Sequence, residues 1–253
     1  MRLDFYYWSH MCPLNCEMIS LLQEYGGKFD IRLHDISGDF ELAKSLKMYY
    51  PTMTVEGGRR YYSPFGKKFL DALLVGDKPE EKAYAPAIGR AEAVGRVVPI
   101  TRDNYYLAGG CIGRSCSAGF GSKVSFLEGM GLKTFGFINI ISGAMAGGAE
   151  YVPSIVVPYD IPRGERTAFI TCVYRTDSLW DYKSPSLRAL EDYLAHDFDE
   201  VYVISDEKGV FPNGDMEFFA SNNYKDNCVV FDEPGYCRLH LMSKSLWKRS
   251  CLN

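Results

Sequence analysis

Residues 3–16 (LDFYYWSHMCPLNC) and residues 49–55 (YYPTMTV) decide the fold of the first third of the chain. The first stretch is an apolar and aromatic run, typical of a β-strand, that reaches Cys12-Pro13 and continues into a helical pattern. The second stretch places Pro51 and Thr52 at the entrance of another strand pattern. A cysteine at a strand-to-helix turn therefore accompanies a proline at a later strand entry.

Strand and helix patterns alternate through the rest of this region. Helix ends are indicated by Gly26-Gly27 and Gly76, and a two-strand hairpin by the turn Gly57-Gly58. The predicted elements are a strand at 3–8, a helix at 13–25, a strand at 29–36, a helix at 40–49, strands at 52–56 and 59–62, and a helix that begins at Ser63-Pro64. Their order is βαβαββα.

This order, with its cysteine and its proline, resembles the thioredoxin fold. In that family the proline is cis and faces the cysteine, so the resemblance implies a cis bond before Pro51. Redox members carry Cys-x-x-Cys, whereas here Cys12 and Cys16 are separated by one residue more. The resemblance offers Cys12 and Cys16 as catalytic thiols, with a structural or vestigial cysteine pair as the alternative. His10 is interpreted as an exposed loop residue.

A second α+β region follows a junction rich in charge, alanine, proline and glycine at residues 77–96. We expect domains at 1–80 and 93–253, joined by a linker at 81–92. The predicted elements of the second region are strands at 97–104, 133–141, 149–157, 166–174, 200–205, 228–233 and 237–244, and helices at 124–130, 187–196 and 216–224.

The second region resembles the GNAT acetyltransferases over residues from about 93 to 245. VVPITRDN (97–104) is similar to the family's opening strand, FITCVYR (169–175) to its central strand, and MEFFASNNY (216–224) to its late helix. The closest resemblance is to the YoaP-like proteins, which join a GNAT domain to a thioredoxin-like one, although we expect the opposite domain order there. The resemblance implies an α/β (α+β) fold with a central mixed sheet, acetyl-CoA as acyl donor, and an amine of a small molecule or protein as acceptor.

The resemblance also assigns cofactor contacts. The family's pyrophosphate loop, [R/Q]-x-x-G-x-[G/A], corresponds to residues 181–188, DYKSPSLR, where serines replace glycines and Pro185 lacks an amide donor. The implied contacts are Lys183, Ser184, Ser186 and Arg188 for the pyrophosphate, and the backbone of Ile170, Cys172 and Val173 for the pantetheine arm. Ser184-Pro185 is also an ordinary helix start, so a loop that has lost cofactor binding is the alternative.

Acetyl transfer to an amine needs a base and often a tyrosine acid. Glu150, on a central strand, is the candidate base, with a strand-edge carboxylate facing water as the alternative. Phe219 occupies the position of the family's tyrosine acid, and Tyr224 is expected to be a packed aromatic residue.

Composition and sequence patterns argue against several other classes of protein. The net charge of −4 argues against nucleic acid or an anionic membrane as the main partner. We find no apolar run of the roughly 18 residues that a membrane span requires, no signal peptide and no metal motif, and we expect a cytoplasmic protein with reduced cysteines. A GNAT-type acetyltransferase is the leading hypothesis. A thiol-disulfide oxidoreductase using Cys12 and Cys16, or a non-catalytic binding protein, are the alternatives, and the oligomeric state is left open.

Overall fold

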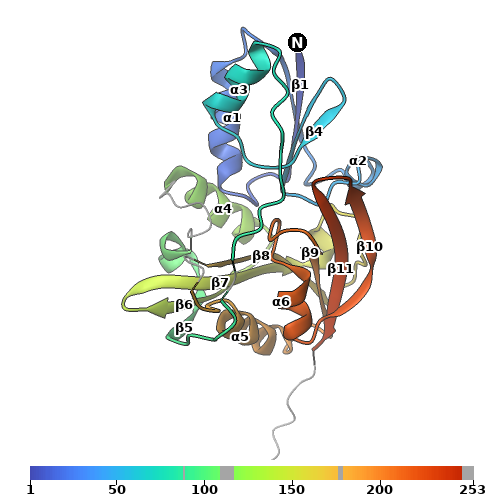
Figure 1. The fold of residues 1–253 in the computed structure, drawn as a ribbon. Coiled ribbons are helices and arrows are strands. Elements are labelled where there is room, and N and C mark those ends of the chain that lie inside the picture. Colours follow the sequence, from blue (N-terminus) through green and yellow to red (C-terminus); the bar gives the residue numbers. More distant parts are fainter. Residues whose placement is uncertain (88, 109–116, 176–178, 247–253) are drawn as a thin grey trace, which may run out of the picture. The chain divides into compact units, whose positions relative to one another are not determined.

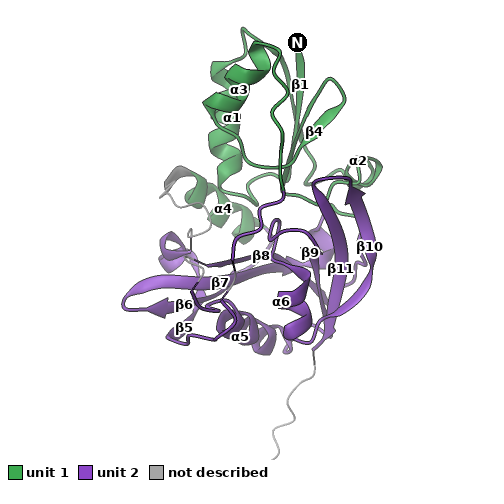
Figure 2. Ribbon diagram, viewed as in Figure 1, with its two compact units in different colours: residues 1–82, 116–129, 158–160 green, residues 83–115, 130–157, 161–253 purple. Residues whose placement is uncertain are grey.

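The computed structural model describes the whole chain except residues 88, 109–116, 176–178 and 247–253 (Figure 1). The chain divides into two compact units, which are described separately (Figure 2). Unit 1 consists of residues 1–82, 116–129 and 158–160. Unit 2 consists of residues 83–115, 130–157 and 161–253.

Unit 1 contains a four-stranded sheet with the strand order β2-β1-β3-β4, in which β1 is parallel to β2 and antiparallel to β3. Its strands are β1 (Arg2–Tyr7), β2 (Asp30–Asp35), β3 (Thr52–Glu56) and β4 (Arg59–Tyr61). Its helices are α1 (Leu14–Glu24), α2 (Phe40–Ser45), α3 (Lys67–Leu74) and α4 (Ser117–Gly129). Over residues 1–80 the order of elements is the predicted βαβαββα.

The core of unit 1 forms where β1 meets α1 and α3. Leu3 and Phe5 are two residues apart on β1, so their side chains point to the same face of the sheet, and both are fully buried. Met18 and Leu22, one helical turn apart on α1, complete this core together with Leu70 of α3. The periodicity of the sequence therefore fixes which faces of these elements pack together.

Three expectations for unit 1 are wrong. Helix α3 begins at Lys67 rather than Ser63-Pro64, because the backbone N–H groups of Tyr62 and Ser63 donate to the Glu81 carboxylate in a non-helical segment. Helix α2 ends at Ser45, since Lys47 adopts a left-handed conformation. The expected cis bond before Pro51 is trans, because among the described residues the cis peptide bond is the one between Phe211 and Pro212.

Unit 2 is built on a seven-stranded mixed sheet with the order β10-β11-β9-β8-β7-β6-β5. The strands are β5 (Arg96–Ile100), β6 (Gly136–Ile141), β7 (Ala144–Pro153), β8 (Thr167–Arg175), β9 (Glu200–Asp206), β10 (Lys225–Glu233) and β11 (Cys237–Ser245). The helices are α5 (Ser184–Leu194) and α6 (Met216–Ser221), with short 3-10 helices η1 (Arg102–Leu107) and η3 (Ser154–Val156). Neighbouring strands are antiparallel except β8 and β9, which are parallel and connected through α5 (Figure 1).

Helix α5 covers one face of this sheet. Its Leu187, Leu190 and Leu194 follow a helical spacing and are almost fully buried against Ile170 of β8 and Val203 of β9. This packing holds the start of α5 beside the ends of the two central strands. In the described part of the chain, no helix is long and apolar enough to cross a membrane.

Candidate functional site

The parallel strands β8 and β9 diverge half-way along their length. Their pairing runs from Thr167 opposite Glu200 to Ile170 opposite Val203, although β8 continues to Arg175. On its other edge β8 stays paired with β7 as far as Arg175. The backbone of residues 171–175 is therefore outside the β8–β9 ladder on the side that faces β9.

This divergence contains two of the three predicted pantetheine contacts. Ile170 is the last residue of β8 that pairs with β9, whereas Cys172 and Val173 lie in the diverging part. Thr171 forms a bulge between β7 and β8, and its buried hydroxyl has no hydrogen-bond partner among the described residues. A strand edge that lies outside a ladder in this way can bind an extended chain of amide groups.

The start of α5 is capped by a side chain from the preceding turn. The Asp181 carboxylate accepts the backbone N–H groups of Lys183 (2.9 Å) and Ser184 (3.0 Å) as well as the Ser184 hydroxyl. The buried Ser186 hydroxyl donates to the carbonyl of Gly147 on β7 (3.3 Å). Both predicted serines therefore hold the start of the helix in place, and their direct contact with a pyrophosphate stays a prediction.

Lys183 is a buried cation at this helix start. Its side chain is 3% exposed, and Nζ lies 3.7 Å from the centroid of the Phe218 ring. Burial lowers the pKa of Lys183 from 10.5 to about 8. Burial is the main cause of this lowered pKa; Asp215 and Asp181 oppose the shift, and Arg175 and Arg90 contribute to it.

Arg175 is the last residue of β8, and sequence reasoning did not single it out. Its Nη2 donates to the carbonyl of Ala87 (2.7 Å), and its buried Nη1 has no hydrogen-bond partner among the described residues. Arg90 forms an ion pair with Glu217 of α6. Arg90, Arg175 and Lys183 thus converge on the start of α5. Arg175 could have been found in the sequence as a basic residue at the end of the strand that precedes the predicted pyrophosphate loop.

The segment 83–95 lies along this site. It forms backbone hydrogen bonds with Asp181, whose N–H donates to Ala91 and whose carbonyl accepts from Ala93. A Cβ atom at Gly89 would lie 2.2 Å from the carbonyl oxygen of Leu179, so this close approach requires glycine. The predicted linker is therefore packed against the start of α5.

Arg188, the fourth predicted pyrophosphate contact, is paired with the segment 83–95. Its two guanidinium nitrogens donate to both oxygens of Glu92 at 2.7 and 2.6 Å. The pair is about half exposed to solvent. This pairing makes Arg188 a less available ligand than Arg175, whose Nη1 has no partner among the described residues.

Glu150 lies on β7, opposite Cys172 in the diverging part of β8. Its side chain is 2% exposed, so the alternative of a carboxylate facing water is wrong. The Tyr105 hydroxyl lies 3.2 Å from both carboxylate oxygens and donates to this group. Neighbouring Ala149 and Tyr151 belong to the core beneath α5, so Glu150 faces the opposite side of the sheet.

The late helix offers no acid at the expected position. Phe219 is fully buried and packs edge-on against Tyr224, with ring centroids 5.1 Å apart. The prediction that Tyr224 is packed is confirmed. Burial and the neighbouring Glu191 raise the pKa of Tyr224 well above its ordinary value, which makes it a poor proton donor.

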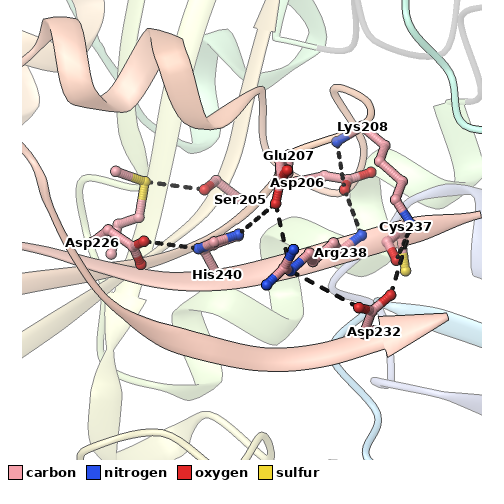
Figure 3. A network of polar contacts seen from close by, with 10 residues as sticks. Ser205, Asp206, Glu207, Lys208, Asp226, Asp232, Cys237, Arg238 and His240 are labelled. Atoms are coloured by element: carbon pink, nitrogen blue, oxygen red, sulfur yellow. Dashed lines mark hydrogen bonds and ion pairs between the residues drawn. The ribbon is translucent and has the colours of Figure 1, made fainter. Parts of the chain in front are cut away.

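A polar network fixes the end of β9, which forms one side of the divergence (Figure 3). His240 of β11 contacts Asp226 through Nδ1 (3.0 Å) and Glu207 through Nε2 (3.2 Å). The Asp206 carboxylate accepts the backbone N–H of Arg238 (2.9 Å), although burial raises the pKa of Asp206. These contacts join the last residues of β9 to β11.

Cys12 and Cys16 belong to unit 1, where they lie at the start of α1. The imidazole of His10 contacts Cys16, with 3.2 Å between Nδ1 and Sγ. Both residues are half-buried, so His10 is not the exposed loop residue of the sequence interpretation. In the described part of the chain, no group of three or more His, Cys, Asp or Glu side chains is arranged to hold a metal ion.

Comparison with known proteins gives structural likenesses over part of the chain. No protein-family model and no curated protein matches it. It is similar to the aminoglycoside 6'-N-acetyltransferase from Enterococcus faecium, at 14% identity over 61% of this chain and 98% of that one, with a TM-score of 0.43. It is also similar to a putative acetyltransferase from Salmonella typhimurium, determined with its cofactor acetyl-CoA, at 10% identity over 62% and 97%, with a TM-score of 0.46. A GNAT-family acetyltransferase from Streptococcus pneumoniae matches at 7% identity over 60% and 98%, with a TM-score of 0.44.

Proposed function

We propose that unit 2 is a GNAT-type N-acetyltransferase that transfers the acetyl group of acetyl-CoA to an amine of a small molecule or protein. The observation that carries this proposal is the divergence of β8 from β9 with Arg175 and Lys183 at its end. We further propose that residues 1–80 form a thioredoxin-like domain, 81–92 a linker and 93–253 the transferase domain, which would then include residues 116–129 and 158–160 of unit 1.

The part of β8 that lies outside the β8–β9 ladder suits the pantetheine arm. That arm carries amide groups along an extended chain, and such groups can pair with a strand edge as another strand would. Cys172 and Val173 would supply backbone donors and acceptors, so the contact places no demand on their side chains. The hydroxyl of Thr171, which has no hydrogen-bond partner in the described part of the chain, adds a polar group at the same edge.

The cations at the end of β8 suit the pyrophosphate. Arg175 Nη1 is a buried donor without a partner among the residues that the structure describes, and such a donor is satisfied when an anion binds. Lys183 is a second buried cation, and its charge costs free energy until an anion neutralises it. Both lie at the start of α5, where the helix dipole also favours negative charge. Ser184 and Ser186 would act by holding this helix start.

Glu150 would accept a proton from the amine acceptor. When bound, acetyl-CoA supplies the thioester whose acetyl group is transferred. An amine attacks only in its unprotonated form, so the Glu150 carboxylate would take that proton at Oε1 or Oε2, directly or through water. The Tyr105 hydroxyl donates to both oxygens and keeps the carboxylate oriented beside β8.

Calorimetric titration of the full chain with CoA and acetyl-CoA tests this proposal. We expect saturable binding that Arg175→Gln weakens by about 10- to 100-fold, because a charge-assisted hydrogen bond contributes about 1.5–3 kcal/mol. Arg166→Gln is the matched control, since Arg166 precedes the opposite end of β8 and pairs with Asp199. The absence of binding at millimolar CoA would contradict the proposal. Binding without acetylation of any amine in a broad screen would favour the non-catalytic alternative.

A further inference from the structure

Segment 83–95 crosses the site proposed for the pyrophosphate and is attached on both sides of it. Near one end, the carbonyl of Tyr84 accepts the backbone N–H of Val210 (2.8 Å), which lies in the loop between β9 and α6. At the other end, the backbone N–H of Gly95 donates to the side chain of Asn139 on β6 (2.8 Å). Between these two contacts the segment passes the start of α5.

Polar contacts, and not apolar packing, hold this segment in place. None of its described residues is buried, and the side chains of Tyr84 and Val94 are 66% and 64% exposed. At the start of α5, by contrast, Lys183, Ser184 and Ser186 are all buried. An element with few buried apolar contacts opens at a low cost in free energy. Segment 83–95 can therefore leave its position without disturbing the core of unit 2.

Acceptor groups of the segment occupy the donors that a phosphate group would use. The carbonyl of Ala87 accepts Nη2 of Arg175 (2.7 Å). The carboxylate of Glu92 accepts both terminal guanidinium nitrogens of Arg188 at 2.7 and 2.6 Å. A phosphate binds a guanidinium group in the same bidentate way as a carboxylate does. Glu92 therefore competes with an incoming phosphate for Arg188, as Ala87 does for Arg175.

We propose that segment 83–95 is an autoinhibitory strap that closes the cofactor site in the free protein and that the pyrophosphate of CoA displaces. This inference rests on the function proposed above for unit 2. The apparent affinity for CoA is then the intrinsic affinity reduced by the fraction of molecules in which the segment is open. Any substitution that weakens only the closed arrangement should make CoA bind more tightly.

Two substitutions weaken the closed arrangement by different means. Glu92→Gln removes the half-exposed ion pair with Arg188 and adds no bulk, so CoA should bind about two- to fivefold more tightly. Gly89→Ala places a Cβ atom 2.2 Å from the Leu179 carbonyl oxygen, so the segment must shift. We expect a gain of about fivefold or more for this variant. Damage to the fold would weaken binding, so it cannot imitate this result.

The experiment is a calorimetric titration of the full-length variants with free CoA. Asp199→Asn is the matched control, because it breaks the exposed bidentate pair with Arg166 beside the opposite end of β8. Its affinity for CoA should equal that of the wild-type protein. Amide hydrogen exchange gives a second readout at Ala93, whose N–H donates to the Asp181 carbonyl (3.1 Å). Saturating CoA should speed the exchange of this amide, because displacement of the segment breaks its hydrogen bond.

The outcomes separate this inference from the proposed function. CoA binding by the wild-type protein that neither Glu92→Gln nor Gly89→Ala tightens would overturn the inference and leave the proposed function in place. Protection of the Ala93 amide by CoA would do the same, since the segment would then be a fixed wall of the site. If the wild-type protein and both variants all failed to bind millimolar CoA, the proposed function and the inference would fall together.

Discussion

Replacement of Lys183 by methionine should stabilise the protein in the absence of ligand, which is the opposite of the usual effect of a core substitution. Burial lowers the pKa of Lys183 from 10.5 to about 8, and this difference corresponds to about 3 kcal/mol of destabilisation when the group is charged in the folded state. The contact of the Lys183 Nζ with the Phe218 ring stabilises the charged folded state by about 1–2 kcal/mol. We therefore expect Lys183→Met to raise the free energy of unfolding by about 1–2 kcal/mol at pH 7.

The pH dependence gives this prediction its sign. The folded-state pKa of Lys183 is below the unfolded value, so the folded protein binds the proton less tightly than the unfolded chain. The penalty is complete below about pH 8 and disappears as the pH rises toward 10.5, where the amine is neutral in both states. The advantage of the variant should therefore shrink over this range.

Thermal denaturation of the wild-type protein and Lys183→Met between pH 7 and pH 10 measures this difference. Lys225→Met is the matched control, because Lys225 is exposed and should show no pH-dependent difference of this kind. A melting temperature of Lys183→Met below that of the wild-type protein at pH 7 would contradict a net cost of the buried charge. A stability difference that stayed constant from pH 7 to pH 10 would contradict the lowered pKa as its cause.

Three further substitutions test other parts of the account. Lys244→Met should lower the free energy of unfolding by about 3–5 kcal/mol in chemical denaturation, because it leaves the buried Glu191 carboxylate without its 2.6 Å ion pair; addition of Glu191→Gln should recover most of the loss. Gly89→Ala should cost about 1–3 kcal/mol in the same measurement, since its Cβ would meet the Leu179 carbonyl, and an unchanged midpoint would contradict the packing of segment 83–95. Glu150→Gln should slow acetyl transfer by about 100-fold or more with unchanged affinity for acetyl-CoA in calorimetry, whereas a normal rate would remove Glu150 as the base.

Much of the fold could be predicted because local signals agree with the final packing. Glycines mark the end of α1 and the β3–β4 turn, and apolar spacing along α5 matches the face that it buries. The predicted start of strand β7 is wrong, because the strand begins at Ala144 rather than at residue 149. Gly147 and Gly148 resemble a turn in the sequence. A Cβ atom at Gly147 would lie 2.5 Å from the Tyr182 carbonyl, so close approach of two segments explains this glycine.

The candidate site was less accessible to sequence reasoning because its contacts join distant parts of the chain. Lys183 could be found from its place before a helix. The contribution of Arg175 depends on the hydrogen bond to Ala87, and that of Arg90 on a segment that was predicted to be a linker. The contact of His10 with Cys16 is local, yet it depends on the unusual backbone at Ser9, which no residue pattern indicates.

Amide hydrogen exchange with and without acetyl-CoA examines the proposed cofactor site itself, because it reports on the backbone of β8 residue by residue. We expect saturating acetyl-CoA to protect those amides of residues 171–175 that face away from β7, because this part of β8 lies outside the β8–β9 ladder. Residues 167–170, which already pair with β9, should change little. Protection that appeared elsewhere while residues 171–175 exchanged at the same rate as before would contradict the assignment of this divergence as the cofactor site.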